Sequence, residues 1–477
     1  MANSTPYRPD PLYAALAPAF ADPVQPAAFP KHLLRWRHQR WAEQVGLGDL
    51  SASAWEDHFA RFLPLPGNLS QPLAMRYHGH QFRHYNPDIG DGRGFLFAQL
   101  RDGRGRLLDL ATKGSGQTPH SRAGDGRLTL KGGVREVLAA AMLEAQGVNT
   151  SKAFSLFETG EALTRGDEPS PTRSSVLVRL SHSHMRFGTF QRAAYLERPD
   201  LIEALIAHVG QAYYPHILDE PQAAQAGALL RAVVEASARL AAQWMAAGFV
   251  HGVLNTDNMV VTGESFDYGP WRFLPASVPG FTAAYFDQTG LYAFGRQPET
   301  VGWNLAQLAG ALALVSEEAP LFAALKDYAA LYQRALRDAV FARLGIAATT
   351  LEADLDFLEG LFSWMTETEV DWGQFFHDWF GGAASAARAM DGRLRSVYCG
   401  DSFAAVRAGF EARASVRPER LAHAYWQRAQ PASLVIEEME ALWAPIADRD
   451  DWSAFTAKLD EIEAMRMALD LGPVATS

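Results

Sequence analysis

The sequence predicts an α+β protein built from two lobes, a small strand-rich N-lobe and a larger helical C-lobe, with helical extensions at both ends. Residues 76 to about 180 mix Gly-rich turns with short strand-like runs and one helical pattern, whereas long Ala/Leu-rich helical patterns dominate after residue 195. Residues 251–258 (HGVLNTDN), followed by Asp267-Tyr268-Gly269, have the order and spacing of a kinase catalytic loop and its metal-binding Asp. Together these observations predict a bilobal, protein-kinase-like fold.

Four segments are expected along the chain. Residues 1–75 form an N-terminal extension, residues 76–190 the kinase-like N-lobe, residues 191–345 the kinase-like helical C-lobe, and residues 346–477 a helical, aromatic-rich C-terminal region. The N-terminal extension is expected to contain one helical piece near residues 31–44.

A β-hairpin is the first regular feature expected in the N-lobe. Residues 95–100 and 106–113 have strand patterns, and the Asp102-Gly103-Arg104-Gly105 sequence between them favours a tight turn. Residues 132–146 follow as a helix that ends before Gly147, a residue type common just after helix C-termini. Apolar side chains recur on one face of this helix, at Val134, Val137, Leu138, Ala141 and Met142.

Helices are expected through most of the remaining chain. After a further strand over residues 176–180, apolar periodicity predicts helices over 226–247, 303–315 and 320–335. Gly248 ends the first of these and leads into the loop at His251. The region after residue 350 is helical, and its crowded aromatic side chains are expected to pack a core, with a cofactor or peptide groove as the alternative. These side chains are Phe362, Trp364, Trp372, Phe375, Phe376, Trp379 and Phe380.

Composition restricts the location and the partners. The chain has 477 residues, a formal charge of −11 and one cysteine, Cys399. The negative charge argues against nucleic acid or an anionic membrane as the main partner. A single cysteine excludes an intrachain disulfide and a multi-cysteine metal site, which suits a reducing compartment. No run is apolar enough for a transmembrane helix, and residues 1–30 lack a signal-peptide pattern, so we expect a cytoplasmic protein.

The loop after His251 carries the acidic and amide groups of the predicted site. In a kinase the catalytic base lies five residues before the metal-binding Asn, and Val253 occupies that position here. Val253 cannot accept a proton, but Asp257 lies next to Asn258 and is the remaining acid. Asn258 and Asp267 offer the oxygen ligands that Mg²⁺ or Mn²⁺ prefers. Although Asp and Asn are often simple turn residues, this spacing predicts nucleoside triphosphate binding and puts ordinary γ-phosphate transfer in doubt.

The N-lobe supplies candidate phosphate-binding groups. The Gly90-Asp91-Gly92-Arg93-Gly94 run would let the backbone approach phosphate oxygens, and Arg93 adds a cation, although such a turn is often plain structure. Lys113 ends the second hairpin strand and Glu136 lies on the following helix, in the order of a kinase Lys–Glu pair. The structural alternative for both residues is exposure to solvent.

Two further groups are candidates with alternative interpretations. The Gly/Ser/Arg-rich loop over residues 114–127 precedes a helix and is either an anion cradle or a plain surface loop. Arg179 and Arg186 could clamp phosphates in bidentate fashion or form surface salt bridges. His182 and His184 lack a clear third metal ligand, so hinge or surface positions are expected for them.

Several blocks of the sequence resemble the selenoprotein O family. They are residues 75–82 (MRYHGHQF), 109–119 (DLATKGSGQTP), 121–126 (SRAGDG), 186–190 (RFGTF), 251–259 (HGVLNTDNM) and 267–270 (DYGP). The resemblance implies a pseudokinase-fold protein adenylyltransferase that transfers AMP from ATP to Ser, Thr or Tyr hydroxyls of proteins, with the enzyme itself among the candidate acceptors. Some members are reported to use UTP, so UMP transfer by the same site is an alternative.

The resemblance also implies roles for individual residues. The nucleotide is expected to bind reversed relative to a kinase, so that its α-phosphate lies near the acceptor hydroxyl and pyrophosphate leaves. Asp257 is implied as the proton acceptor, and Glu136 as the partner that holds Lys113, these three forming the catalytic set. Asn258 and Asp267 are implied as ligands of Mg²⁺ or Mn²⁺. The implied nucleotide contacts are Gly90, Gly92, Arg93, Lys113, Asp125, Gly126, Arg179, Arg186 and Asp267.

The C-terminal part departs from the family pattern. Many members carry a selenocysteine or cysteine close to the C-terminus, and residues 471–477 contain neither. Residues 410–477 are also expected to match the family poorly.

Two other functions compete with nucleotide transfer. One is a kinase or other phosphotransferase that uses Asp257 as its base, and Val253 argues against it. The other is a nucleotide-binding scaffold without catalysis, and the Asn258–Asp267 pair argues against that.

Overall fold

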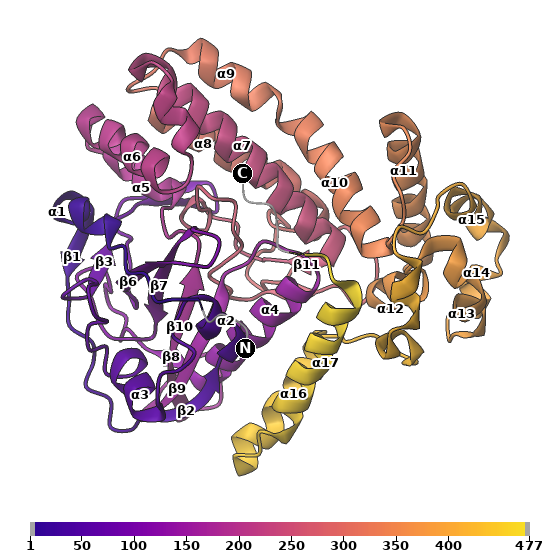
Figure 1. Ribbon diagram of the computed structural model, residues 1–477, viewed down its shortest axis with the longest axis horizontal. Coiled ribbons are helices and arrows are strands. Elements are labelled where there is room, and N and C mark those ends of the chain that lie inside the picture. Colours follow the sequence, from indigo (N-terminus) through magenta and orange to yellow (C-terminus); the bar gives the residue numbers. More distant parts are fainter. Residues whose placement is uncertain (1–4, 473–477) are drawn as a thin grey trace.

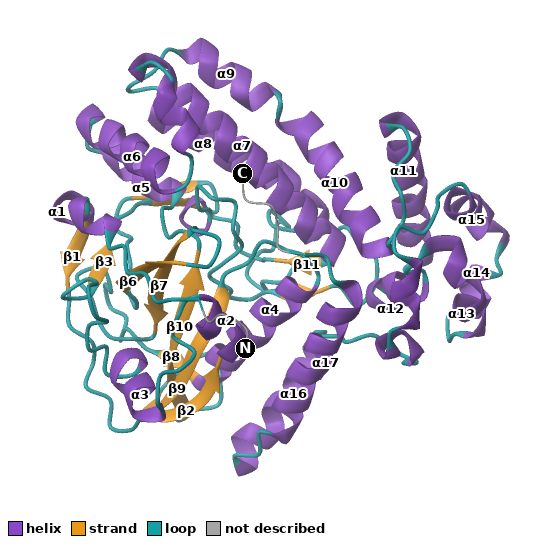
Figure 2. Ribbon diagram, in the orientation of Figure 1, coloured by secondary structure: helices purple, strands orange, loops and turns teal. Residues whose placement is uncertain are grey.

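The computed structural model describes residues 5–472 and shows the α+β architecture that the sequence predicts (Figure 1). All strands of its large sheet lie between residues 21 and 181, and the chain after residue 187 is mainly helical. Figure 2 shows the sheet on one side of the molecule and the long helices on the other. The expectation about the chain end falls mostly on residues 473–477, which lie outside the described residues.

The large sheet has eight strands in the order β1-β3-β6-β7-β10-β9-β2, with β8 paired to β10. Neighbouring strands run antiparallel throughout. Its strands are β1 (Ala21–Pro23), β2 (Leu33–Arg37), β3 (Leu73–Met75), β6 (Leu96–Arg101), β7 (Leu107–Lys113), β8 (Leu128–Thr129), β9 (Lys152–Leu163) and β10 (Thr172–Ser181). Two small two-stranded sheets pair β4 (Gly79–Gln81) with β5 (His84–Asn86) and β11 (Phe249–Val250) with β12 (Arg272–Phe273).

The N-terminal part of the chain supplies both edges of the large sheet. β1 and β3 form one edge, and β2 pairs with β9 at the other. Residues 31–44 contain β2 followed by helix α2 (Gln39–Gln44), so the prediction of one helix there is wrong in its first half. The reason is a long-range pairing, since Leu33 lies opposite Glu158 of β9 and local periodicity cannot register such a partner.

Strand β9 was not predicted, because polar residues interrupt its apolar pattern. Ser155 and Glu158 are nevertheless buried in it. The Trp55 indole N–H donates to the Ser155 hydroxyl at 2.9 Å, and Arg35 and Arg173 both donate to the Glu158 carboxylate. Buried polar groups are tolerated when they are hydrogen-bonded in this way.

The predicted hairpin and the helix after it are confirmed. The Asp102 carboxylate accepts hydrogen bonds from the backbone N–H groups of Arg104 and Arg106, both at 2.9 Å, which closes the β6–β7 turn. Thr129 is the N-cap residue of helix α4 (Leu130–Ala145), and its hydroxyl accepts a hydrogen bond from a backbone N–H of the first turn. Gly147 follows the helix with φ +79°, the left-handed conformation expected of a C-terminal glycine.

The two faces of the large sheet contact different cores. Leu107 and Leu177 face the core shared with α4 and the helical part of the chain. Leu108 and Val178, their neighbours in sequence, face a second core completed by α2 and α3 (Ala52–Phe59). This alternation follows from the two-residue period of a strand and explains why the sheet is buried on both sides.

The helical part is built around α7 (Gln222–Ala247), which ends at Gly248 with φ +66°. Helix α7 packs against α8 (Gln297–Leu312), α9 (Glu318–Lys326) and α10 (Tyr328–Leu344). The single helix expected over 320–335 is therefore two helices that meet at Asp327. The shorter helices α1 (Ala17–Phe20), α5 (Phe187–Tyr195) and α6 (Pro199–Ala212) precede α7.

The crowded aromatic residues after residue 350 pack in the interior, as expected, rather than forming a cofactor or peptide groove. Trp364, Trp372, Phe375 and Trp379 belong to one buried cluster, while Phe362 packs against it partly exposed. The helices that carry and surround them are α11 (Leu351–Thr368), α12 (Trp372–Asp378), α13 (Ala386–Asp391), α14 (Arg395–Tyr398) and α15 (Ala404–Glu411).

The last two helices return to the sheet. Helix α17 (Ser453–Leu469), which follows α16 (Ile436–Arg449), packs against α4, as Figure 1 also shows. Asp450, between them, forms ion pairs with Arg35 at 3.0 Å and with Arg173 at 2.6 Å. Across the described residues, no helix combines the length and apolar character needed to span a membrane.

Candidate active site

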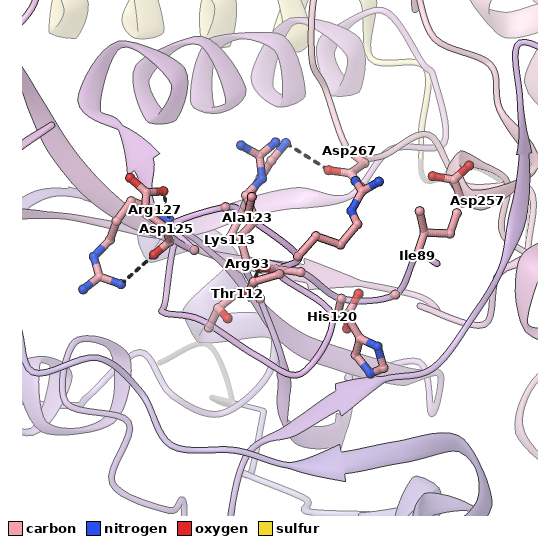
Figure 3. Close-up of a pocket in the computed structure, with 18 of the residues that line it drawn as sticks. Ile89, Arg93, Thr112, Lys113, His120, Ala123, Asp125, Arg127, Asp257 and Asp267 are labelled. Atoms are coloured by element: carbon pink, nitrogen blue, oxygen red, sulfur yellow. Dashed lines mark hydrogen bonds and ion pairs between the residues drawn. The ribbon is translucent and has the colours of Figure 1, made fainter. Parts of the chain in front are cut away.

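A polar cavity of about 720 Å³ brings most of the predicted site residues together (Figure 3). Its size is within the range of small-molecule sites in proteins. Figure 3 shows Asp257 and Asp267 toward one end and Asp125 and Arg127 toward the other. Of the predicted residues, Gly90, Gly92, Arg93, Lys113, Asp125, Gly126, Arg179, Arg186, Asp257 and Asp267 line the cavity. Glu136 and Asn258 are not among its lining residues.

Lys113 is buried at the end of β7 and is held between two carboxylates. Its ammonium group contacts the Glu136 carboxylate and lies 2.9 Å from Asp267 Oδ1. Lys113 is only 4% exposed and Glu136 only 2%, so exposure to solvent is wrong as an interpretation of either residue. Helix α4 places Glu136 behind the lysine, which explains why Glu136 does not line the cavity itself.

The Asp267 carboxylate is the point where three cations meet. Besides Lys113, Arg179 lies 3.3 Å from Oδ1 and Arg186 lies 3.3 Å from Oδ2. Burial alone would raise the pKa of Asp267, but Lys113 and the two arginines hold it well below its ordinary value. Asp267 has φ +62°, a left-handed conformation that is uncommon for residues other than glycine and clusters at functional sites.

Arg179 and Arg186 are buried, so the alternative that they form salt bridges on the surface is wrong. Arg179 comes from β10, where it pairs with Ala111 of β7, and its guanidinium lies 5.6 Å from the Phe266 ring centre. The Arg186 guanidinium stacks 4.4 Å from the ring centre of Tyr77 and donates to the Asp257 carbonyl oxygen at 2.6 Å. These contacts fix both cations in place before any anion binds.

Asp257 lies in a short 3-10 turn over Thr256–Asn258. Its Oδ1 is buried without a hydrogen-bond partner among the described residues, and its Oδ2 has only a long contact of 3.5 Å from the Gln81 side-chain amide. Burial raises the pKa of Asp257 to about 6. A buried carboxylate with a free oxygen and a pKa closer to neutrality can accept a proton from a bound hydroxyl.

One hydrogen bond closes the loop that carries Asp257, and a second connects this loop to the segment before Asp267. The Asn258 side-chain N–H donates to the Val253 carbonyl oxygen at 2.9 Å, and the His251 ring donates to the Phe266 carbonyl oxygen at 3.0 Å. The Asn258 amide oxygen receives no hydrogen bond from the described residues and so is available to a ligand. The His251–Phe266 bond stabilises the relative positions of the two loops.

The donor set fits a hard divalent cation. Asp267 offers a carboxylate, Asn258 an amide oxygen, and the unpartnered Oδ1 of Asp257 lies nearby in the same turn as Asn258. Mg²⁺ and Mn²⁺ prefer oxygen ligands and commonly complete their coordination with phosphate oxygens. Within residues 5–472, no group of three or more His, Cys, Asp or Glu side chains could hold a metal ion.

The glycines of the 90–94 run are required by packing. A Cβ atom on Gly90 would lie 2.6 Å from the His120 ring, and one on Gly94 would lie 2.2 Å from the Thr112 carbonyl oxygen. The run is therefore pressed against β7 and the 114–127 loop, which form one wall of the cavity. Arg93 is exposed and makes no side-chain ion pair within the part of the chain that the structure describes.

The far end of the cavity contains an ion pair that the sequence did not indicate. Asp125 pairs with Arg165 at 2.8 Å, and although partial burial would raise the pKa of Asp125, Arg165 lowers it. The adjacent Gly126 has φ +71°, and a Cβ there would lie 2.2 Å from the backbone carbon of Gly116. Arg165 is on the β9–β10 connection, and no motif marks it.

Asp91 and Gln81 also line the cavity, although neither was assigned a role from the sequence. Asp91 lies 3.4 Å from Arg186, and its other oxygen accepts from the Met75 backbone N–H at 3.1 Å. Gln81 lies in the 75–82 block and Asp91 in the Gly-rich run over residues 90–94. Their place in these motifs was the sequence signal that could have identified them as site residues.

His182 and His184 are buried, which corrects the surface position considered for them. The His184 ring lies 3.2 Å from the Asp109 carboxylate, and the His182 backbone N–H donates to Glu264 at 2.8 Å. Burial lowers the pKa of His182 to about 4, so this histidine is neutral. Neither histidine lines the cavity.

Comparison with known proteins identifies the family of the chain. The family model described as "Protein adenylyltransferase SelO" matches residues 5–463. The match runs to residue 463 and so spans most of residues 410–477, and the expectation that this region resembles the family less than the rest of the chain stays a prediction.

Several relatives carry the name "Protein nucleotidyltransferase YdiU". One from Synechocystis sp. is 42% identical over 467 residues and covers 95% of this chain and 98% of its own. One from Synechococcus elongatus is 47% identical over 369 residues, 77% of this chain and 74% of its own. One from Vibrio cholerae serotype O1 is 38% identical over 373 residues, 77% of this chain and 73% of its own.

Proposed function

The chain belongs to the protein adenylyltransferase SelO family and is an enzyme of the nucleotidyltransferase class, and from this premise we propose that it transfers AMP from ATP to a Ser, Thr or Tyr hydroxyl of a protein. The observation that carries the proposal is the buried cluster in which Lys113, Arg179 and Arg186 meet at Asp267. The three cations of the cluster are matched by the carboxylates of Asp267, Glu136 and Asp91, but the cavity as a whole is lined by seven Lys or Arg side chains and four Asp side chains, an excess of positive charge that favours a polyphosphate.

We propose that the nucleotide binds reversed relative to a kinase. Arg179 and Arg186 come from the last strand of the sheet and the segment after it, where a kinase-like fold would receive the adenine. Guanidinium groups at that place suit phosphates rather than a base. Val253 supports the same proposal, because a kinase would need an acid at that position for γ-phosphate transfer. The kinase-like arrangement of two lobes is part of this proposal.

The reaction needs one proton acceptor and one leaving group. The acceptor hydroxyl gives its proton to the Asp257 carboxylate while its oxygen attacks the α-phosphorus, and the bond between that phosphorus and the β-phosphate oxygen breaks. Pyrophosphate leaves and AMP remains on the acceptor. Lys113, held by Glu136, and the two arginines stabilise the negative charge on the phosphates during the transfer.

We assign Asn258 and Asp267 as the protein ligands of the divalent metal, Mg²⁺ or Mn²⁺. When bound, the metal would neutralise phosphate charge and polarise phosphate oxygens. Asp267 would hold the metal by giving up at least one of its present cationic partners, and that cation would then be free to pair with a phosphate.

Isotope position tests the proposal. The purified full chain is incubated with Mg²⁺ or Mn²⁺ and with ATP or UTP labelled at either the α- or the γ-phosphate, together with candidate protein acceptors. We expect label on protein only from the α position and pyrophosphate release in equal amount. Label from the γ position alone would identify a kinase, and tight binding without turnover would identify a scaffold. Intact mass shows whether the enzyme also modifies itself.

A further inference from the structure

An exposed aromatic surface lies beside the loop that carries Asp257. Tyr285 is 86% exposed and Phe286 47% exposed, and their ring centres are 5.2 Å apart. The Phe286 ring also lies 5.9 Å from the ring of Phe82, which is half-buried. We call these three residues the aromatic platform. Contiguous exposed apolar side chains of this kind mark interaction sites more often than single exposed residues do.

The platform is attached directly to the proposed catalytic loop. The Phe82 backbone N–H donates to the Asn255 side-chain oxygen at 3.2 Å and to the Tyr292 hydroxyl at 3.1 Å. The Tyr292 hydroxyl donates in turn to the same Asn255 oxygen at 2.7 Å. Gln81, next to Phe82, contacts Asp257 and lines the cavity. The platform is therefore continuous with the wall of the cavity at the Asp257 end.

The turn between β4 and β5 holds Phe82 in an uncommon conformation. Phe82 has φ +50° and Arg83 has φ +64°, two consecutive left-handed residues that are not glycine. Such backbone persists only where its surroundings hold it, and it concentrates at functional sites. Here the holding contacts are the hydrogen bonds to Asn255 and Tyr292, and the result is that the Phe82 ring meets Phe286.

The exposed charges at the rim of the platform are two arginines and one carboxylate, whereas the Asp287 carboxylate beside Phe286 is buried and accepts hydrogen bonds from backbone N–H groups. Arg83 lies 3.3 Å from Glu299, and Arg296 lies 3.4 Å from the same carboxylate. Two guanidinium groups thus share one carboxylate at an exposed place. An acidic side chain on a partner would complement this rim, although the chain as a whole carries a formal charge of −11.

We propose that the aromatic platform is the docking surface for the acceptor polypeptide, an extended segment with a large apolar residue near its acceptor hydroxyl and an acidic residue close to that apolar side chain. The proposal rests on the proposed function, because an acceptor hydroxyl must approach Asp257 and the polypeptide that carries it must lie against the adjoining surface. Aromatic side chains give such a surface large contact area at small loss of conformational freedom.

Peptide libraries test this surface on the full-length enzyme. Each library has one central Ser, Thr or Tyr, and one flanking position at a time is fixed as Phe, Leu, Ala, Asp or Lys. Transfer is followed with α-labelled ATP, and binding is followed separately by fluorescence anisotropy of the same peptides. For the unmodified enzyme we expect at least fivefold higher transfer and tighter binding when one particular flanking position is Phe or Leu rather than Ala.

In the double variant Tyr285→Ala/Phe286→Ala, the ratio of transfer to the Phe or Leu libraries over transfer to the Ala libraries should fall to about one. Its transfer to the Ala libraries and its affinity for ATP should stay within about twofold of the unmodified enzyme. Phe322→Ala is the matched control, because Phe322 is 74% exposed but lies on α9, away from the Asp257 loop, and this variant should keep the full preference.

Equal use of the Phe and Ala libraries by the unmodified enzyme, in both transfer and binding, would overturn the docking surface while α-label transfer upheld the proposed function. Selective peptide binding that the double variant loses, without any α-label transfer, would support the surface and reject the proposed chemistry. A double variant with unchanged peptide preference but an altered oligomeric state in sedimentation would show that the platform binds a second copy of this chain, which also overturns the proposal.

Discussion

Asp267 and its three cationic partners determine how the cavity responds to a charged ligand. In the structure the Asp267 carboxylate forms ion pairs with Lys113, Arg179 and Arg186, at 2.9, 3.3 and 3.3 Å respectively. The ion cluster therefore balances much of its own charge internally. Under the proposed function, a nucleotide with its metal would replace these pairs by exchange, with the phosphates pairing with the cations and the metal with the carboxylate.

Asp267→Ala tests this exchange. We expect transfer to fall by about 10²–10³-fold, the usual effect of removing one electrostatic partner of a transition state. The variant should also lose the gain in ATP affinity that metal provides. Metal-free ATP should bind more tightly than to the unmodified enzyme, because the three cations no longer share their charge with a carboxylate. Calorimetric titration with and without Mg²⁺ measures both effects.

Asp267→Asn is the control for shape, since it keeps the side-chain volume and one oxygen. It should resemble Asp267→Ala in metal dependence. Full activity in either variant, with unchanged metal dependence, would remove Asp267 from the metal site.

Asp257 is expected to act on the acceptor rather than on the nucleotide. Asp257→Asn should lower transfer by about 10²–10⁴-fold, the range that general base catalysis contributes. The affinity for ATP should change less than threefold, because the cationic cluster and its partners remain. The measurement is steady-state transfer to protein together with ATP titration. A large loss of ATP affinity with unchanged turnover would instead place Asp257 among the nucleotide contacts.

At the scale of elements, β7 and α4 carry the two halves of the Lys113–Glu136 pair. The register of β7 against β10 places Lys113 opposite Leu177, and the cap at Thr129 sets where α4 begins. The far end of α4 is held by Glu144, which pairs with Arg40 at 2.7 Å and accepts from the Trp41 indole at 2.9 Å. Glu144 thereby joins α4 to α2, an element of the N-terminal segment.

Glu144→Gln tests this junction through pH. Burial alone would raise the pKa of Glu144, but Lys152, Arg40 and His38 lower it to about 2. The folded protein then binds fewer protons at this group than the unfolded chain does, so the stabilisation is present above pH 4.5 and is lost as pH falls toward 2. The variant should lose roughly 2–3 kcal/mol at pH 7 and show less acid sensitivity.

Urea unfolding of both proteins at pH 7 and pH 3.5 measures the difference. Glu440→Gln is the control, because the Glu440 side chain is 50% exposed and pairs with Lys131 on the same helix α4. An exposed pair contributes about 0–1 kcal/mol, so the control should unfold nearly like the unmodified protein. Equal pH dependence in Glu144→Gln and the unmodified protein would show that another group dominates.

For the whole molecule, the cavity depends on segments that are distant in sequence. Its walls come from β7, the 114–127 loop, β10 and the two loops that carry Asp257 and Asp267. Helix α17 packs on α4, the helix that carries Glu136. Binding in the cavity therefore links the sheet to the helical part, and a ligand of the folded state should stabilise both.

ATP with Mg²⁺ should raise the thermal midpoint of the full chain by a few degrees. A ligand at 100 times its dissociation constant adds about 2.7 kcal/mol to the folded state. Differential scanning fluorimetry measures the shift, and removal of the metal with a chelator should reduce it. An equal shift in Lys113→Ala would show that the ligand binds somewhere other than this cavity.

Much of the fold and of the candidate site followed from local patterns. The β6–β7 hairpin, α4 and α7 with their terminal glycines, and the C-terminal aromatic core were all predicted, because turn residues and apolar periodicity act over a few residues. The residues of the site were also named before the structure brought most of them to one cavity. Their individual roles stay predictions.

The errors came from contacts between distant segments. β2 and β9 pair across more than a hundred residues, and the hydrogen bonds that bury Ser155 and Glu158 come from Trp55, Arg35 and Arg173. The Arg165–Asp125 pair likewise joins residues that are distant in sequence. Strand propensity depends on cross-strand neighbours, which a local window does not contain.

Residue types, their spacing and the family resemblance predicted the groups proposed for the chemistry of this protein: oxygen donors at Asn258 and Asp267, cations at Lys113, Arg179 and Arg186, and an acid at Asp257 in place of the one missing at Val253. The folded chain was needed to establish which of these groups are buried and which touch. Burial and charge pairing arise when remote segments exclude water from the same space, and only then do the cations meet at one carboxylate and does the pKa of Asp257 rise to about 6.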